Sequence, residues 1–186
     1  RADALVMGRF ADGTPVVLSP TASQPVPVPN NFNYAKDPDG QKCPFQAHIR
    51  KVNPRQQGIP RIVRRGIPYG EREKEPKDKP SLKELPNEDV GLLFMCYQRN
   101  IEKQFEVLQY MTNEPRFPRK QEPGIDPVAG QPGEMGVGQQ RWPTQWDAPR
   151  KEHKPFDFNR FVAFKGGEYL FAPSIHFLKN IQQILT

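Results

Sequence analysis

A single histidine lies in the segment of this chain whose residue types are best suited to chemistry. His48 belongs to residues 43–55, C-P-F-Q-A-H-I-R-K-V-N-P-R, which predict a short, cation-rich helix between Pro44 and Pro54. Histidine can act as an acid, a base or a metal ligand, and the 186-residue chain has only three of them. A lone histidine is more often just a hydrogen-bonded polar residue, so His48 by itself identifies no site.

Two adjacent arginines form the second chemically informative pattern. Residues 61–70, R-I-V-R-R-G-I-P-Y-G, predict a strand on which Arg64 and Arg65 point to opposite faces. A permanently charged guanidinium can stabilise negative charge that develops on a bound reactant, whereas adjacent arginines can also simply coat a strand. Asp157 precedes a further predicted strand and, on its own, is an ordinary turn acid.

These segments, taken in order, resemble the dye-decolourising peroxidases, a family of haem enzymes. The family carries the runs C-P-[FY]-x-A-H-[IV]-R-[KR]-x-N-P-R, R-x-G-I-x-Y-G and G-G-x-Y-x-F-x-P-S. Residues 43–55, 64–70 and 166–174 match them. The resemblance extends from about residue 4 to the end of the chain, apart from two inserts.

The resemblance implies a site for haem b. His48 would be the axial ligand of the iron, because peroxidases use a neutral, oriented imidazole for this purpose. Asp157 lies where the family has the carboxylate that accepts the second imidazole N–H and raises the basicity of the ligand. Glu152 is the alternative acid if Asp157 is not the partner. Arg64 would lie on the distal face of the haem, next to bound peroxide.

The resemblance also implies a distal pocket and routes for electrons. Leu92 and Phe94 are two residues apart, so they share one strand face and would limit access to the haem. The same two residues are compatible with an ordinary core. Tyr69 matches a family tyrosine proposed to pass electrons from large donors. Trp142 and Trp146 could also serve, although tryptophans in loops are more often packing anchors.

One piece of the family pattern is missing from the chain. The distal aspartate of the family lies in a G-x-x-D-G motif, upstream of every segment matched above. Residues 8–13, G-R-F-A-D-G, have one residue too many, which makes Asp12 a turn residue. We therefore expect residues 1–186 to be the carboxy-terminal haem-binding domain of a two-domain enzyme. The amino-terminal half would be a partner chain, and Arg1 in place of a methionine suggests processing.

The expected fold class is α+β, and the resemblance sharpens it to a ferredoxin-like antiparallel sheet with helices on one side. The apolar patterns predict strands at residues 4–7 and 15–18 across a turn, at 59–69 and at 90–97, and a strand or a tight hairpin at 161–171. They predict helices at about 44–53, 101–111 and from Ser174 onward. Loops are expected at residues 20–41, 71–89 and 113–156.

Bulk properties narrow the remaining function classes. The 27 cations are interleaved with 21 acids and leave a net charge of +6, and without a basic stripe we expect no nucleic-acid partner. No apolar run is long enough to span a membrane. Cys43 and Cys96 have no C-x-x-C spacing, so their pairing and the compartment, cytoplasmic or secreted, stay open.

The first functional hypothesis is a haem peroxidase that reduces hydrogen peroxide and oxidises dyes or phenolic donors one electron at a time. An alternative is a non-catalytic haem-binding or haem-handling protein, because the chain lacks the upstream acid. A third is a basic interaction protein without a cofactor.

Overall fold

The structure is a computed structural model that describes residues 1–22, 28, 30–71, 73, 81, 84–86, 88–118, 123–132, 138–157 and 162–184. The helices are α1 (Ala2–Met7), α2 (His48–Val52), the π-helix η3 (Glu102–Glu106), α3 (Val107–Asn113), the 3-10 helix η4 (Arg150–Glu152) and α4 (Ile175–Ile184). The strands are β1 (Val63–Tyr69), β2 (Gly91–Tyr97), β3 (Gln139–Trp142) and β4 (Lys154–Asp157).

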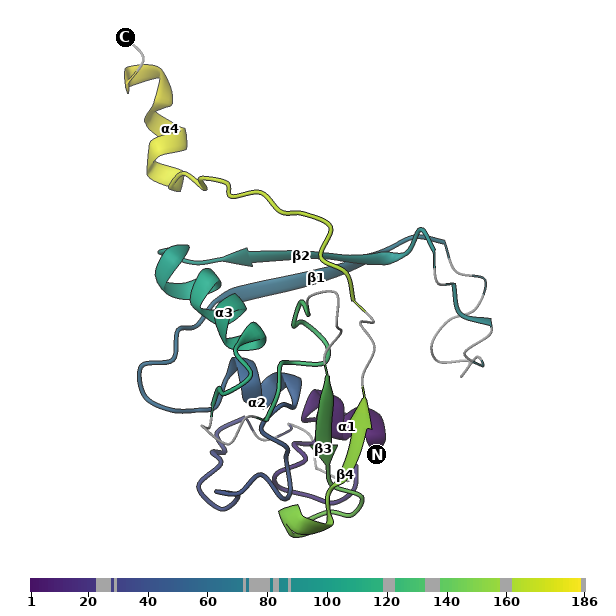
Figure 1. Cartoon of the computed structure of the whole chain (residues 1–186). Coiled ribbons are helices and arrows are strands. Elements are labelled where there is room, and N and C mark those ends of the chain that lie inside the picture. The colour runs from purple at the N-terminus through teal and green to yellow at the C-terminus, as the bar shows by residue number, and fades with distance from the viewer. Residues whose placement is uncertain are drawn as a thin grey trace.

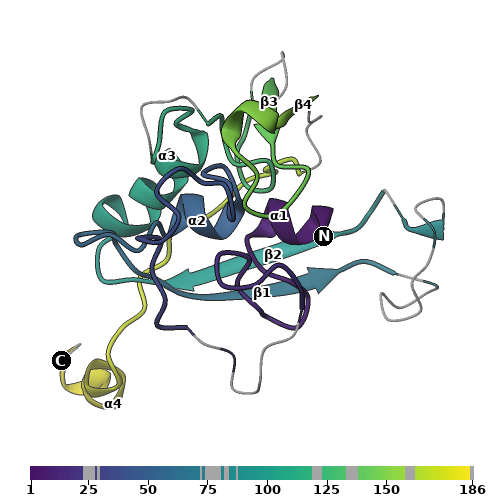
Figure 2. The ribbon, with the colours of Figure 1, turned by 90° about the horizontal axis from the view of Figure 1, so that it is seen from below.

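Two antiparallel strand pairs organise these elements. β1 pairs with β2, and β3 pairs with β4. Helices α1, α2 and α3 lie on one side of the β1–β2 pair, whereas α4 lies on the other side at the end of an extended segment (Figures 1 and 2). The expected α+β class with antiparallel strands is therefore confirmed, and among the described α-helices α4 alone departs from the expected placing of the helices on one side (Figure 1).

The buried core surrounds α1 and α2 rather than the β1–β2 pair. One cluster contains Ala4, Leu5, Val16 and Trp142, and a second contains Val17, Tyr34, Cys43 and Ala47. By contrast, the large apolar side chains on β1 and β2 are 41–73% exposed. The helix that carries His48 thus has a packed support, while the strand pair presents apolar surface.

The beginning of the chain corrects the prediction of a strand hairpin. Residues 4–7 belong to α1, and Gly8 ends this helix in the left-handed conformation, with φ 89° and its N–H bonded to the carbonyl of Ala4 at 2.7 Å. A single bridge between Arg9 and Pro15 is what remains of the hairpin. Asp12 is a turn residue, as expected, and its carboxylate accepts the N–H of Thr14 at 2.9 Å.

The other elements agree with the sequence to different degrees. β1, β2, α2 and α4 lie within or close to their predicted ranges, and the helix expected at 101–111 is η3 continued by α3. Residues 162–171 form no strand, while β3 and β4 occur in the predicted loop at 113–156. Phe161 lies outside the described residues. Within the described part of the chain, no helix is long and apolar enough to cross a membrane.

Candidate active site

The candidate site is built on His48, the first residue of α2. Its Nδ1 lies 2.7 Å from Oδ2 of Asp126, and its side chain is 22% exposed whereas that of Asp126 is fully buried. The structure thus places Asp126, rather than the predicted Asp157 or its alternative Glu152, at this nitrogen; the side chain of Asp157 itself lies outside the described part of the chain. Asp157 is the last residue of β4, opposite Gln139. An imidazole nitrogen has room for one partner, and a buried carboxylate occupies that position.

Asp126 is held in place by backbone hydrogen bonds. Its Oδ1 accepts the N–H groups of Val128 at 2.8 Å and Ala129 at 3.1 Å, and its own N–H donates to the carbonyl of Thr112 at 2.9 Å. These contacts leave Oδ2 directed at His48. The carboxylate is therefore oriented before any ligand binds, as expected of a group that fixes the tautomer of a metal-ligating histidine.

A buried ion pair supports α2 from the side of the preceding loop. Arg50 donates to Oδ2 of Asp37 at 2.6 Å, and its guanidinium lies between the rings of Tyr34 and Phe45, at 4.3 and 4.4 Å from their centroids. Asp37 also accepts the N–H of Cys43 at 3.0 Å. Burial raises the pKa of the Cys43 thiol to about 12, so it stays protonated at neutral pH. Cys43 and Cys96 are free cysteines.

The other two histidines have different surroundings. His153 is buried and its Nε2 lies 3.1 Å from the carbonyl of Ala148, and burial lowers the pKa of its imidazole. His176 is exposed on α4 and contacts Asn180. Among the described residues, His48 alone joins a partly exposed imidazole to a buried carboxylate.

Three of the predicted distal residues share one face of the β1–β2 pair. Arg64 lies opposite Cys96, Gly66 opposite Phe94, and Pro68 opposite Leu92, and residues opposite each other point to the same face. Arg64, Phe94 and Leu92 are all exposed in this chain. The ring of Phe94 stacks on Phe105 of η3, with centroids 6.3 Å apart, so the face is turned toward that helix. The strand register thus groups the residues that the sequence assigned to a distal pocket.

The candidate electron-transfer residues have separate environments. Tyr69 ends β1 and is 52% exposed, with its ring lying over Gly91. Trp142 is buried in the core cluster with Leu5. Trp146 donates its indole N–H to the carbonyl of Val16 at 2.7 Å. Both tryptophans therefore have packing roles, and electron transfer through any of the three stays a prediction.

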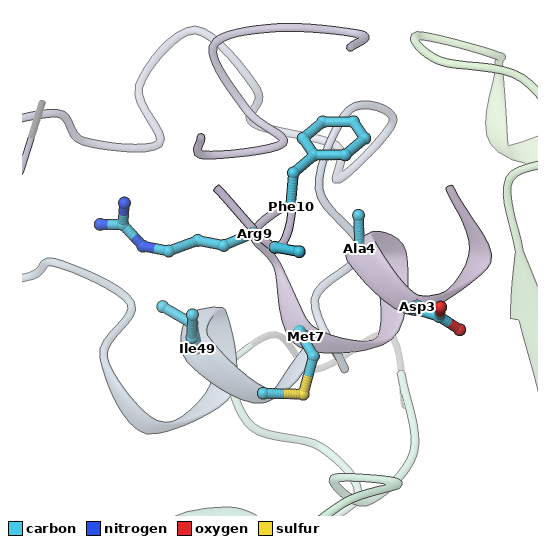
Figure 3. Close-up of a pocket in the computed structure, with 7 residues that line it drawn as sticks. Asp3, Ala4, Met7, Arg9, Phe10 and Ile49 are labelled. Carbon is cyan, nitrogen blue, oxygen red and sulfur yellow. The ribbon is translucent and has the colours of Figure 1, made fainter. Parts of the chain in front are cut away.

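Two hollows are open on the surface near α2, and neither is lined by His48. One, of about 300 Å³, lies between α1 with the segment after it and Ile49 of α2 (Figure 3). The other, of about 340 Å³, is lined by Tyr34, Phe45, Arg50 and their neighbours. Both are at the lower limit of typical ligand pockets. His48 and Asp126 thus lie outside both hollows.

The donor set fits an axial haem ligand. Nδ1 of His48 is engaged by Asp126, and among the described residues Nε2 has no hydrogen-bond partner. The described part of the chain has no group of three or more His, Cys, Asp or Glu side chains that could hold a metal ion. A porphyrin supplies four ligands itself and needs only one imidazole from the protein, so these residues fit haem better than a bare ion.

Known proteins with similar sequences decide the family. The sequence profile described as "Dyp-type peroxidase, C-terminal" matches residues 19–121. The chain belongs to the DyP-type peroxidase family. It is 39% identical to the multifunctional dye peroxidase DyP2 of Amycolatopsis sp., over 97% of this chain and 41% of that protein. Its fold is that of the family, because a DyP-type peroxidase from Anabaena superposes with a TM-score of 0.80 and 42% identity, over 97% of this chain and 38% of that one.

The chain matches only part of the length of each of these relatives. This DyP-type chain spans about two fifths of the length of the dye peroxidases it matches, such as DyP2. Another is the dye-decolorizing peroxidase AauDyP1 of Auricularia auricula-judae, at 33% identity over 94% of this chain and 38% of that protein. A deferrochelatase of Yersinia pestis is 37% identical over 83 residues, which are 44% of this chain and 17% of that protein. The resemblance seen in the sequence motifs is thereby confirmed at the level of the family.

Proposed function

We propose that this chain is the haem-binding, carboxy-terminal part of a peroxidase that reduces hydrogen peroxide and oxidises dyes or other aromatic donors. The observation that carries the proposal is the pairing of His48 with the buried, backbone-oriented Asp126, which leaves Nε2 available. This arrangement matches the requirement for an axial ligand that stays neutral, oriented and electron-rich.

Each residue of the site has a distinct task in this proposal. Haem b, held through Nε2 of His48, would supply the redox chemistry. Asp126 accepts a hydrogen bond from Nδ1–H of His48 and increases electron donation by the imidazole. The guanidinium of Arg64 would stabilise the negative charge that develops on the peroxide oxygens as their bond breaks. Hydrogen peroxide takes up two electrons and two protons to give two waters, and two donor molecules supply one electron each.

We propose further that the working enzyme includes an amino-terminal half that carries the distal aspartate. Two observations support this. The chain spans only 41% of DyP2 and 38% of AauDyP1. The β1–β2 pair exposes large apolar side chains such as Leu92, Leu93 and Phe94, and apolar patches of this kind are usually covered.

Dye turnover by a haem-loaded preparation tests the proposal. We expect a Soret band, a pyridine haemochrome spectrum of haem b, and peroxide-dependent loss of an anthraquinone dye. Electrophoresis and intact mass should show sequence additional to these 186 residues in the active species. Haem binding without turnover, even with the amino-terminal half present, would favour a haem-handling role, the alternative suggested by the deferrochelatase match. A preparation that binds no haem would contradict both roles, and an active species of this chain alone would contradict the need for a partner.

A further inference from the structure

A charged side chain that the proposed mechanism does not use is buried beside the candidate site. Lys51 lies three residues after His48 in α2, so the two side chains are neighbours on the helix surface. Lys51 is 0% exposed and is among the largest fully buried side chains of the described chain. Burying an ammonium group costs several kcal/mol unless its hydrogen bonds are satisfied, so its position calls for an explanation.

Three backbone carbonyls satisfy this ammonium group. Nζ of Lys51 donates to the carbonyl oxygens of Glu114 at 2.7 Å, Phe117 at 2.7 Å and Gly124 at 2.5 Å. An ammonium group has three N–H donors, so all of them are used. Two of the acceptors follow α3, and the third lies two residues before Asp126. Lys51 therefore connects α2 both to the residues that follow α3 and to the residue two positions before Asp126.

The third acceptor has a backbone that few other residues would allow. Gly124 has φ +93°, and a Cβ atom there would lie 2.5 Å from Nε2 of Gln140. The amide of Gln140 in turn donates to the carbonyl of Ile125 at 2.7 Å. The chain just before Asp126 is thus fixed by two side chains, one from α2 and one from β3.

Lys51 also acts electrostatically on the same carboxylate. Burial lowers the pKa of Lys51 to about 8, and the charges of Asp126 and Glu114 oppose that effect. The attraction is mutual, so it adds to the hydrogen bonds that hold the segment of Asp126 against α2.

We propose that Lys51 is a positioning residue for the histidine ligand: its ammonium group ties α2, which carries His48, to the segment that delivers Asp126, and so holds that carboxylate against Nδ1. This inference rests on the proposed role of His48 as the axial ligand. It assigns to Lys51 control over the electron donation of the ligand, in addition to its contribution to the fold.

A double-mutant cycle on the complete haem-loaded peroxidase tests the inference. Lys51→Met keeps the length of the side chain and removes its charge and its donors, and Lys103→Met, at an exposed cation of η3, is the control. Lys51→Met should raise the iron reduction potential and lower the iron–histidine stretching frequency, as Asp126→Asn should, because the ligand becomes a poorer donor. In the Asp126→Asn background the same change should add less than half of that shift. Lys103→Met should leave both readouts unchanged.

Several outcomes would overturn the inference. One is a haem-loaded Lys51→Met variant with the wild-type potential, and another is a full shift in the Asp126→Asn background. If Lys51→Met takes up no haem, Lys51→Gln replaces it, because its amide can still donate two hydrogen bonds. Failure of both variants where Asp126→Asn still binds haem would also count against the inference, since Lys51 would then act on the fold alone. Wild-type protein without a Soret band would instead refute the proposed function.

Discussion

Replacing Asp126 by asparagine should create a mismatch between hydrogen-bond donors and acceptors at the site. Oδ1 accepts two backbone N–H groups, from Val128 and Ala129, and Oδ2 faces Nδ1 of His48. An amide has one oxygen and one NH2 group. If the oxygen faces the backbone, the NH2 donates to Nδ1, and the proton of the neutral imidazole must move to Nε2, the atom that would bind iron. If the oxygen instead faces His48, the NH2 group faces the backbone N–H groups of Val128 and Ala129, and a donor then meets donors.

The first orientation takes the lone pair of Nε2 away from iron, and the second leaves buried N–H groups unsatisfied, which costs about 1–3 kcal/mol. This range agrees with the loss of about 10- to 100-fold in metal affinity that is typical when the partner of a ligating histidine is changed. We expect Asp126→Asn to weaken haem binding by that factor, measured by titration at the Soret band. The reduction potential of the variant, loaded with excess haem, should be higher than that of the wild type.

Asp157→Asn is the matched control for this prediction. It makes the same chemical change at the acid that the sequence first suggested, at the end of β4. Haem affinity and reduction potential should stay at wild-type values. A normal affinity in Asp126→Asn, or a loss in Asp157→Asn with Asp126→Asn unaffected, would refute the assignment of the hydrogen-bond partner.

Three further predictions concern Arg64, Arg50 and Lys51. Arg64→Leu should slow the reaction with peroxide by about 100- to 1,000-fold at normal haem content, as for loss of an oxyanion donor; stopped-flow rates equal to wild type would contradict this. Arg50→Met leaves the buried Asp37 without its ion-pair partner and should lower the free energy of unfolding by about 3–5 kcal/mol in urea titrations. An unchanged value would show that the ion pair is not needed for stability. Burial lowers the pKa of Lys51 from 10.5 to about 8, so between about pH 8 and 10.5 the unfolded chain binds more protons than the folded one. The free energy of unfolding of the wild type should therefore rise with pH in this range relative to that of Lys51→Met, as measured by urea titrations. A difference between the two free energies of unfolding that does not change with pH would argue against a lowered pKa of Lys51.

The strands and helices that a local pattern defines were predicted well from the sequence. The apolar run of β2 and the spacing of α4 depend on nearby residues, and the structure agrees with both. Residues 4–7 were mistaken for a strand because a four-residue apolar run fits either conformation, and Gly8 is the signal that a helix ends there. Residues 162–171 have a strand-like sequence, but a strand forms only where a second strand offers hydrogen bonds.

The candidate site was predicted only in part. His48 and the common face of Arg64, Leu92 and Phe94 follow from motifs and from strand alternation. Asp126 was missed because it is 78 positions from His48, and only the folded chain brings the two together. Its one local signal is an acid between apolar residues in Gly-Ile-Asp-Pro-Val-Ala, a context in which an ionised group needs a partner.

The central claim is that Nε2 of His48 binds haem iron, and removal of the imidazole tests it directly. His48→Gly should purify with little haem, and added imidazole should restore haem binding and the Soret spectrum of the wild type by occupying the space beside Asp126. His48→Gly protein that keeps a full complement of haem and an unchanged Soret spectrum without imidazole would contradict the account.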